Sequence, residues 1–131
     1  MKEIVYSENA PKPVGPYSQG VKVGPWLFIS GQIPLDPNTN QLVEGDLAIQ
    51  TRRVLENIKA ILDSAGYKLE DVIKVTIYLT DLSEFHKFNE VYSQYFKEWR
   101  PARTTVQVDA LPRGALVEVD VVAYRDSSEQ S

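Results

Sequence analysis

Three charged side chains lie in segments whose composition otherwise favours β-strands. Arg103 directly follows a Pro-Ala pair at the start of one segment, and Glu118 and Asp120 alternate with valines in another. The spacing alone allows Arg103 and Glu118 to form a structural ion pair or to point into solvent at a strand end. It equally allows a guanidinium at a strand end to bind a substrate carboxylate through two hydrogen bonds, each worth about 1.5 to 3 kcal/mol, while a nearby carboxylate orients water.

Other catalytic side chains are scarce. The chain has no cysteine and one histidine, His86, which no serine-histidine motif accompanies. Thiol nucleophiles and cysteine-ligated metals are therefore excluded, and no carboxylate spacing suggests a metal site. Segment 36–40 resembles the start of a calcium loop, but Gln41 and Leu47 stand where that loop needs glycine and glutamate, so we interpret it as a turn. No glycine-rich phosphate-binding pattern follows a strand, and we expect neither a metal nor a cofactor.

The charge of the chain argues against nucleic-acid binding. The net charge is -4 and the pI is about 5.0, whereas binding to phosphate backbones depends mainly on lysine and arginine. Arg52, Arg53 and Lys59 could form a local basic patch, but a solvated helix face is the simpler interpretation. The N-terminal segment is rich in turn-forming residues and no apolar run reaches membrane-spanning length. We therefore expect a cytoplasmic protein without nucleic-acid or membrane partners.

Two amphipathic helices are expected to position these residues. Asp46 can cap a helix that begins at residue 47 and ends before Gly66, because apolar residues recur between them every three or four positions. A second helix is expected to begin at Asp81, where Glu84 completes a capping box. Its aromatic residues keep helical spacing and are interpreted as core: Phe85, Phe88, Tyr92, Tyr95, Phe96 and Trp99.

Six strands fill most of the remaining chain. The strands are expected at 4–6, 18–23, 26–30, 72–80, 103–108 and 116–124, and turn-forming residues separate them. The fourth alternates apolar and polar residues, which is typical of a strand with one buried face. The last two flank a Leu-Pro-Arg-Gly turn, and the simplest connection pairs them as antiparallel neighbours. Residues 126–131 are expected to form a polar tail.

The element order β-β-β-α-β-α-β-β predicts an α+β fold with a mixed sheet, in one domain over residues 1–131, of which about 1–125 are ordered. Two helices can cover only one face of such a sheet. In the last strand Val117 and Val119 point to one side, while Glu118 and Asp120 point to the other. Because neither side is a plain solvent surface, self-association is the expected way to cover the second face.

Several short motifs are distributed along the chain. They are Glu8-Asn9-Ala10-Pro11, Gly15-Pro16-Tyr17-Ser18-Gln19-Gly20, Ser30-Gly31-Gln32-Ile33-Pro34, Arg100-Pro101-Ala102-Arg103, Leu111-Pro112 and Val117-Glu118-Val119. Their order and spacing, together with Asn57 and Asn89, resemble the RidA (YjgF) family. The resemblance extends from about Glu8 to Arg125.

This resemblance implies a chorismate-mutase-like fold that assembles as a homotrimer, with the sheets forming an inner barrel and with three clefts between subunits. It also implies hydrolytic deamination of reactive 2-imino acids, namely 2-iminobutanoate and 2-iminopropanoate, to 2-oxo acids and ammonium. Pyridoxal-phosphate dehydratases release these unstable compounds from threonine and serine. The ligand would be a small 2-imino or 2-oxo acid, bound without a cofactor.

The resemblance also implies roles for single residues. Arg103 would bind the substrate carboxylate, and Glu118 would hold the water that attacks the imine. The expected substrate-binding residues are Tyr17, Ser30, Gly31, Asn89, Arg103 and Thr105. Gly31 suits a cleft wall because its missing side chain lets backbone groups approach a small ligand. Thr105 stands where many family members carry cysteine, which excludes a thiol role here.

Three functions are compatible with these features. A protonated imine is a strong electrophile, so positioning and a general base that contributes about 10² to 10⁴ would suffice for an enzyme. A noncatalytic trimer that binds small carboxylates as a sensor or regulator would need Arg103 but not Glu118. The ribonuclease and translation-inhibitor activity ascribed to some relatives would need a cationic surface, which the acidic chain does not favour.

Overall fold

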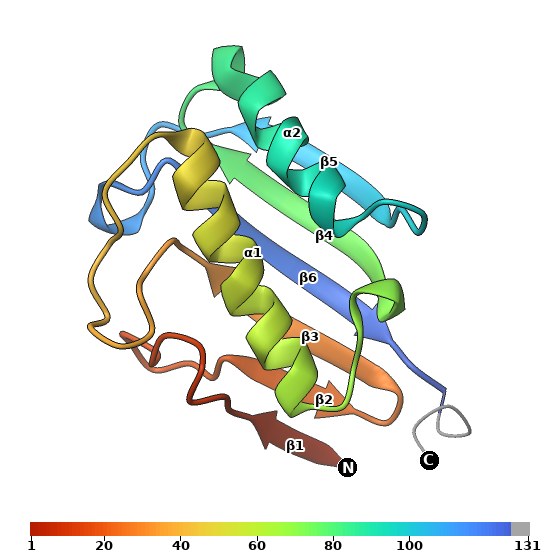
Figure 1. The fold of residues 1–131 in the computed structure, drawn as a ribbon. Helices are drawn as coiled ribbons and strands as arrows, with labels where there is room; N and C mark the ends of the chain where they lie inside the picture. Colours follow the sequence, from red (N-terminus) through yellow and green to blue (C-terminus); the bar gives the residue numbers. More distant parts are fainter. Residues whose placement is uncertain (127–131) are drawn as a thin grey trace.

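The computed structural model describes residues 1–126 as a six-stranded mixed sheet with two helices on one of its faces (Figure 1). Its elements are β1 (Lys2–Val5), β2 (Gly20–Val23), β3 (Trp26–Gln32), α1 (Leu47–Ser64), β4 (Val72–Leu79), α2 (Phe85–Tyr95), β5 (Ala102–Gln107) and β6 (Val117–Tyr124). The predicted α+β class and element order are confirmed. The predicted polar tail lies, except for Asp126, outside the described residues.

Helix α1 begins and ends where the sequence predicts. The Asp46 side chain accepts a hydrogen bond from the amide of Ile49 at 3.1 Å, which caps the first turn. Gly66 follows the last turn with φ of 80°, a left-handed conformation that glycine adopts without strain. The helix packs on β3 and β6 through fully buried residues such as Val54 and Ile58, each of which stabilises the fold by roughly 1.5 to 3 kcal/mol.

Helix α2 begins later and ends earlier than predicted. A 3-10 turn, Leu82–Glu84, precedes it, and the Asp81 side chain accepts a hydrogen bond from the Ser83 amide at 3.0 Å instead of forming the predicted capping box. Trp99 lies beyond the helix, and its indole nitrogen donates to the carbonyl of Val72 at 2.6 Å. The aromatic spacing therefore predicts the helix correctly but overestimates its length.

The two C-terminal strands are not neighbours, so the predicted antiparallel pair of β5 and β6 is wrong. The sheet order is β1-β2-β3-β6-β4-β5, and β4 lies between them, antiparallel to β6 and parallel to β5. Helix α2 connects β4 to β5 as a crossover, which makes these two strands parallel. Strand β5 is consequently an edge strand, as Figure 1 shows.

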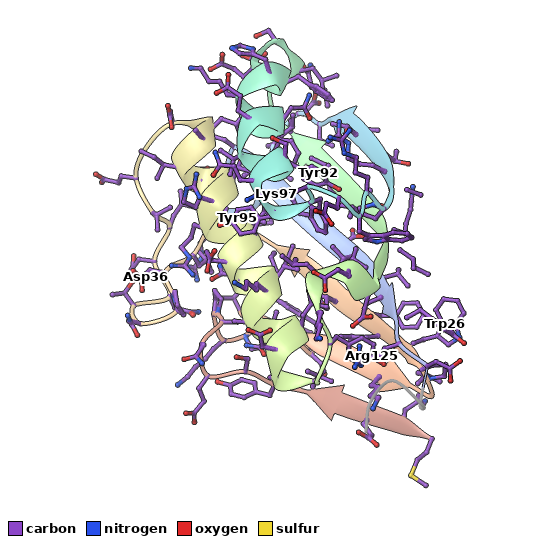
Figure 2. The ribbon with its side chains drawn as sticks, turned by 45° about the vertical axis from the view of Figure 1, so that its right-hand side comes forward. Trp26, Asp36, Tyr92, Tyr95, Lys97 and Arg125 are labelled. Carbon is purple, nitrogen blue, oxygen red and sulfur yellow. The ribbon has the colours of Figure 1, made fainter. Side chains whose placement is uncertain are left out.

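No helix within residues 1–126 covers the sheet face opposite α1 and α2. Along β6, Val117, Val119 and Val121 face the helices and are buried, whereas Glu118 and Asp120 are half-buried on the other face. This face also carries the Trp26 and Phe28 side chains of β3, 40% and 47% exposed, and the Trp26 ring packs against Tyr124 with centroids 4.9 Å apart (Figure 2). Self-association through this face remains a prediction.

No helix among the described residues combines the length and the apolar composition needed to cross a bilayer.

Candidate active site

Arg103 points toward the helices from the edge strand. In the β4–β5 ladder Arg103 pairs with Val75, and Thr105 with Ile77, and both β4 partners are fully buried beneath the helices. Paired residues of adjacent strands share a face of the sheet, so Arg103 and Thr105 face α2. The Arg103 Nη1 donates a hydrogen bond to Asn89 Oδ1 at 2.9 Å.

Three aromatic rings of α2 surround the Arg103 guanidinium. Its central carbon lies 4.9 Å from the ring centroid of Tyr92, 5.1 Å from that of Phe85 and 5.9 Å from that of Phe88. These positions are three and four residues apart, so they share one face of the helix. Cation–π contacts of this kind contribute about 0.5 to 2 kcal/mol. The rings interpreted as core from the sequence therefore also hold the arginine in place, a role that helical spacing alone does not reveal.

A cavity of about 360 Å³ adjoins Arg103 between the end of α2 and the start of β5. Asn89, Tyr92, Arg100 and Arg103 contribute to its lining. Its volume is in the range of small-molecule sites. Tyr92 extends from α2 in this region (Figure 2), and burial raises the pKa of its hydroxyl to about 12 against the opposing charge of Arg103. The cavity therefore offers the cationic side chains of Arg100 and Arg103.

Two hydroxyl groups in this region are buried without a hydrogen-bond partner among the described residues. They are Tyr92 Oη and Thr105 Oγ1. A buried hydroxyl that lacks a partner destabilises the structure, so a bound ligand or water is the expected remedy. Arg103, Asn89 and Thr105 together form what we call the arginine cluster.

Glu118 lies on the opposite face of the sheet, beside Gly31. A Cβ added at Gly31 would overlap Glu118 Oε2 and would lie 2.9 Å from its carboxyl carbon. The missing side chain of Gly31 thus admits the Glu118 carboxylate rather than a ligand, which differs from the reason expected from the sequence. Here β3 is irregular, because its register with β6 shifts between Ile29 and Gln32.

Burial and a neighbouring carboxylate alter the acidity of Glu118. Burial raises its pKa above the ordinary glutamate value, and the charge of Asp120, two residues along the same face, raises it further. Burial also raises the pKa of Asp120, while hydrogen bonds from Tyr78 and Thr76 oppose that shift. A carboxylate with a raised pKa is a stronger base, so it removes a proton from water more readily once it is ionised.

Tyr17 and Ser30 lie close to Gly31 but differ in what they offer a ligand. Tyr17 is 47% exposed and lines a small hollow together with Gly31, and its Oη accepts a hydrogen bond from the Val14 amide at 3.2 Å. The Ser30 hydroxyl donates to the carbonyl of Ser18 at 2.6 Å, so its proton already stabilises the backbone. Tyr17, Gly31 and Glu118 form what we call the glutamate cluster.

The two clusters do not meet within one chain. Arg103 of β5 pairs with Val75 of β4, and Glu118 of β6 pairs with Tyr78 of β4. Strand β4 therefore lies between the strands that carry the two groups. Ideal strand spacing then places their Cα atoms roughly 14 Å apart, with the side chains on opposite faces. A single chain therefore cannot present both groups to one small substrate.

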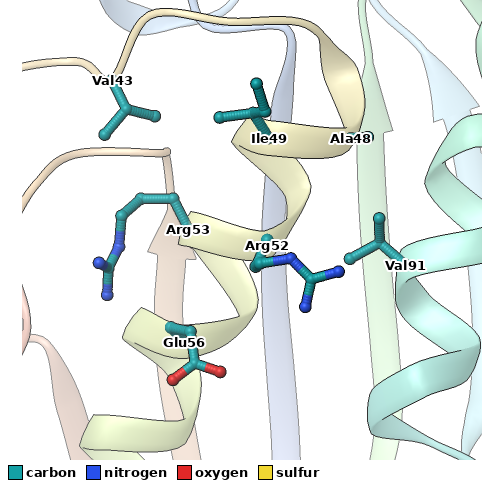
Figure 3. A pocket seen from close by; sticks show the side chains of 7 residues that line it. All are labelled: Val43, Ala48, Ile49, Arg52, Arg53, Glu56 and Val91. Atoms are coloured by element: carbon teal, nitrogen blue, oxygen red, sulfur yellow. The ribbon is translucent and has the colours of Figure 1, made fainter.

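A second cavity, also of about 360 Å³, lies against α1 and α2 but lacks convergent polar groups (Figure 3). Arg52 donates to Gln94 at 2.8 Å and Arg53 donates to Asn57 at 3.1 Å. Figure 3 shows the two guanidinium groups pointing in different directions. These arginines thus do not form a joint phosphate-binding surface. Within residues 1–126 no group of three His, Cys, Asp or Glu side chains is arranged to hold a metal ion.

Known proteins resemble this chain over most of its length. A family model described as Endoribonuclease L-PSP matches residues 7–125. A RutC family protein of Pyrococcus horikoshii is 59% identical over 126 residues, which cover 96% of this chain and 100% of that protein. TdcF of Escherichia coli, provisionally assigned as a reactive intermediate deaminase, is 43% identical over 130 residues, which cover 97% and 100%.

Solved structures share the fold as well. The crystal structure of E. coli TdcF with bound serine has a TM-score of 0.90 and 42% identity, over 95% of this chain and 99% of that one. That of RidA from an Antarctic Psychrobacter has a TM-score of 0.91 and 47% identity, over 94% and 99%. The chain therefore belongs to the endoribonuclease L-PSP family, which is the RidA (YjgF) family that its motifs resemble.

Proposed function

We propose that this protein hydrolyses small 2-imino acids, including 2-iminobutanoate and 2-iminopropanoate, to 2-oxo acids and ammonium. The observation that carries the proposal is the Arg103 guanidinium, which Asn89 and three aromatic rings hold beside a small cavity. A fixed guanidinium binds a carboxylate with little loss of conformational entropy. The provisional assignment of TdcF as a reactive intermediate deaminase supports the reaction type.

Each site would be completed by a neighbouring copy of the chain. The arginine and glutamate clusters lie on opposite faces, and the face that carries Glu118 also exposes Trp26 and Phe28. Packing of a second copy would bury these rings and bring its glutamate cluster near the first copy's Arg103. A homotrimer with three clefts is the assembly we propose.

In the proposed mechanism, Arg103 binds the substrate carboxylate and directs C2 of the imine toward a water held by Glu118. Glu118 removes a proton as the water oxygen bonds to C2, while the C=N π electrons move to nitrogen. Glu118 then gives its proton to the nitrogen of the resulting amino alcohol. The C–N bond breaks and ammonia leaves as the hydroxyl oxygen forms C=O and gives its proton to Glu118, from which ammonia takes it up as ammonium. The raised pKa of Glu118 favours the first transfer, in which the carboxylate removes a proton from water.

The test couples threonine dehydratase to the purified protein and follows the formation of 2-oxobutanoate. Wild type should accelerate it, and Arg103→Ala should abolish the acceleration because the carboxylate loses its partner. Arg52→Ala removes an arginine that lines a different cavity and serves as the matched control. Equal acceleration by wild type and Arg103→Ala would disprove the assigned site.

Glu118→Gln separates catalysis from binding. The amide cannot accept the proton, so turnover should fall by about 10² or more, while affinity for 2-oxobutanoate in calorimetry stays within a factor of a few. Wild type that binds 2-oxobutanoate but does not accelerate hydrolysis would instead support the noncatalytic carboxylate sensor. Unchanged turnover in Glu118→Gln would show that another group is the base.

A further inference from the structure

The cavity beside Arg103 contains a second cation. Arg100 lines the same cavity, and no Asp or Glu side chain is among its lining residues. Arg100 is exposed and makes no ion pair in the part of the chain that the structure describes. Two arginines thus line one small cavity, and neither forms an ion pair within residues 1–126, in a protein whose net charge is -4. Such an arrangement favours a ligand that carries two negative charges.

We propose that this cavity binds the side-chain carboxylate of dicarboxylic 2-imino acids, with Arg103 on the C1 carboxylate and Arg100 on the second one. The inference rests on the proposed function and extends it from neutral substrates to the imines of aspartate and glutamate. Arg100 acts here as a specificity-determining residue. Neutral imines would bind through Arg103 alone.

Calorimetry with stable 2-oxo acids tests the binding mode without relying on turnover. Wild type should bind 2-oxoglutarate at least 10-fold more tightly than 2-oxobutanoate. Arg100→Gln should lower the affinity for 2-oxoglutarate about 10-fold, the loss of one charge-assisted contact, and leave that for 2-oxobutanoate within twofold.

Lys97→Gln is the matched control, because it removes one nearby positive charge from an exposed residue that does not line this cavity. If Lys97→Gln lowers the affinity for 2-oxoglutarate as much as Arg100→Gln does, general electrostatic attraction explains the effect and the proposal is overturned. The proposal is also overturned if Arg100→Gln lowers the affinities for 2-oxoglutarate and 2-oxobutanoate by the same factor.

Turnover separates this inference from the proposed function. An amino-acid oxidase would generate imines from aspartate, glutamate and alanine, and Arg100→Gln should lower kcat/KM for the first two only. If wild type hydrolyses the alanine imine and Arg100→Gln changes no substrate selectively, only the inference fails. If wild type hydrolyses no imine, the proposed function fails, and the calorimetric comparison alone decides the dicarboxylate site.

Discussion

At the scale of single residues, the acidity of Glu118 depends on its neighbour Asp120. They lie on one face of β6, and the charge of Asp120 is one of the causes that raise the pKa of Glu118, after burial. A proposed general base in this position works only when ionised, so the acidic limit of activity should lie above the ordinary glutamate pKa.

Asp120→Asn should lower the pKa of Glu118. The substitution removes the negative charge that disfavours ionisation of Glu118, so its carboxylate would form at lower pH than in wild type. The measurement is the chemical shift of the Glu118 side-chain carboxyl carbon between pH 3 and pH 8. Asp109→Asn, which removes an exposed carboxylate elsewhere, should leave the titration unchanged. A Glu118 pKa that stays the same or rises in Asp120→Asn would refute the coupling.

At the scale of elements, side chains of α2 position the guanidinium of Arg103. Phe85, Phe88 and Tyr92 place their rings near the guanidinium, and Asn89 accepts its hydrogen bond. All four project from one side of a helix of three turns, so the guanidinium orientation depends on how α2 packs against β4 and β5.

Substitutions at Asn89 should reveal this positioning role. Asn89→Ala releases one side of the guanidinium and should weaken 2-oxobutanoate binding about 10-fold, the loss of roughly one hydrogen bond to a charged group. Asn89→Asp should weaken it more, because the new carboxylate would neutralise Arg103 and compete with the ligand. Gln94→Ala, which alters the α2 residue bonded to Arg52, is the control. If Asn89→Asp binds more tightly than Asn89→Ala, Asn89 does not act through Arg103.

The sequence predicts an element well when neighbouring residues determine it, and poorly when contacts between distant segments do. Asp46 and Gly66 determine the ends of α1 through neighbouring backbone groups, so both ends can be predicted. The pairing of β5 and β6 could not be predicted, because a turn pattern reports a change of chain direction and not the insertion of β4 between them. The family motifs name Arg103 and Glu118, but their opposite faces depend on sheet order and register.

At the scale of the whole molecule, the separated clusters predict a shared site. If one subunit supplies Arg103 and its neighbour supplies Glu118, then subunits that each lack one of these residues can still form intact sites together. Equal mixing of Arg103→Ala and Glu118→Gln chains in a ring would produce about one quarter intact sites.

Co-expression of the two variants should therefore restore up to a quarter of wild-type turnover, although each variant alone is inactive. The control is the mixture of the separately purified variants before subunit exchange, which should remain inactive. A co-expressed preparation with no activity above that of the single variants would show that both residues act from the same chain.

The uncovered face of the sheet also carries a tryptophan whose fluorescence should report whether the subunits are associated. Trp26 lies on that face, 40% exposed, and Trp99 is the chain's other indole. In a Trp99→Phe background, emission comes from Trp26 alone, and it should shift to longer wavelength when dilution separates the subunits and admits water to the ring. An emission maximum that is independent of concentration, while light scattering records dissociation, would place the contact between copies elsewhere.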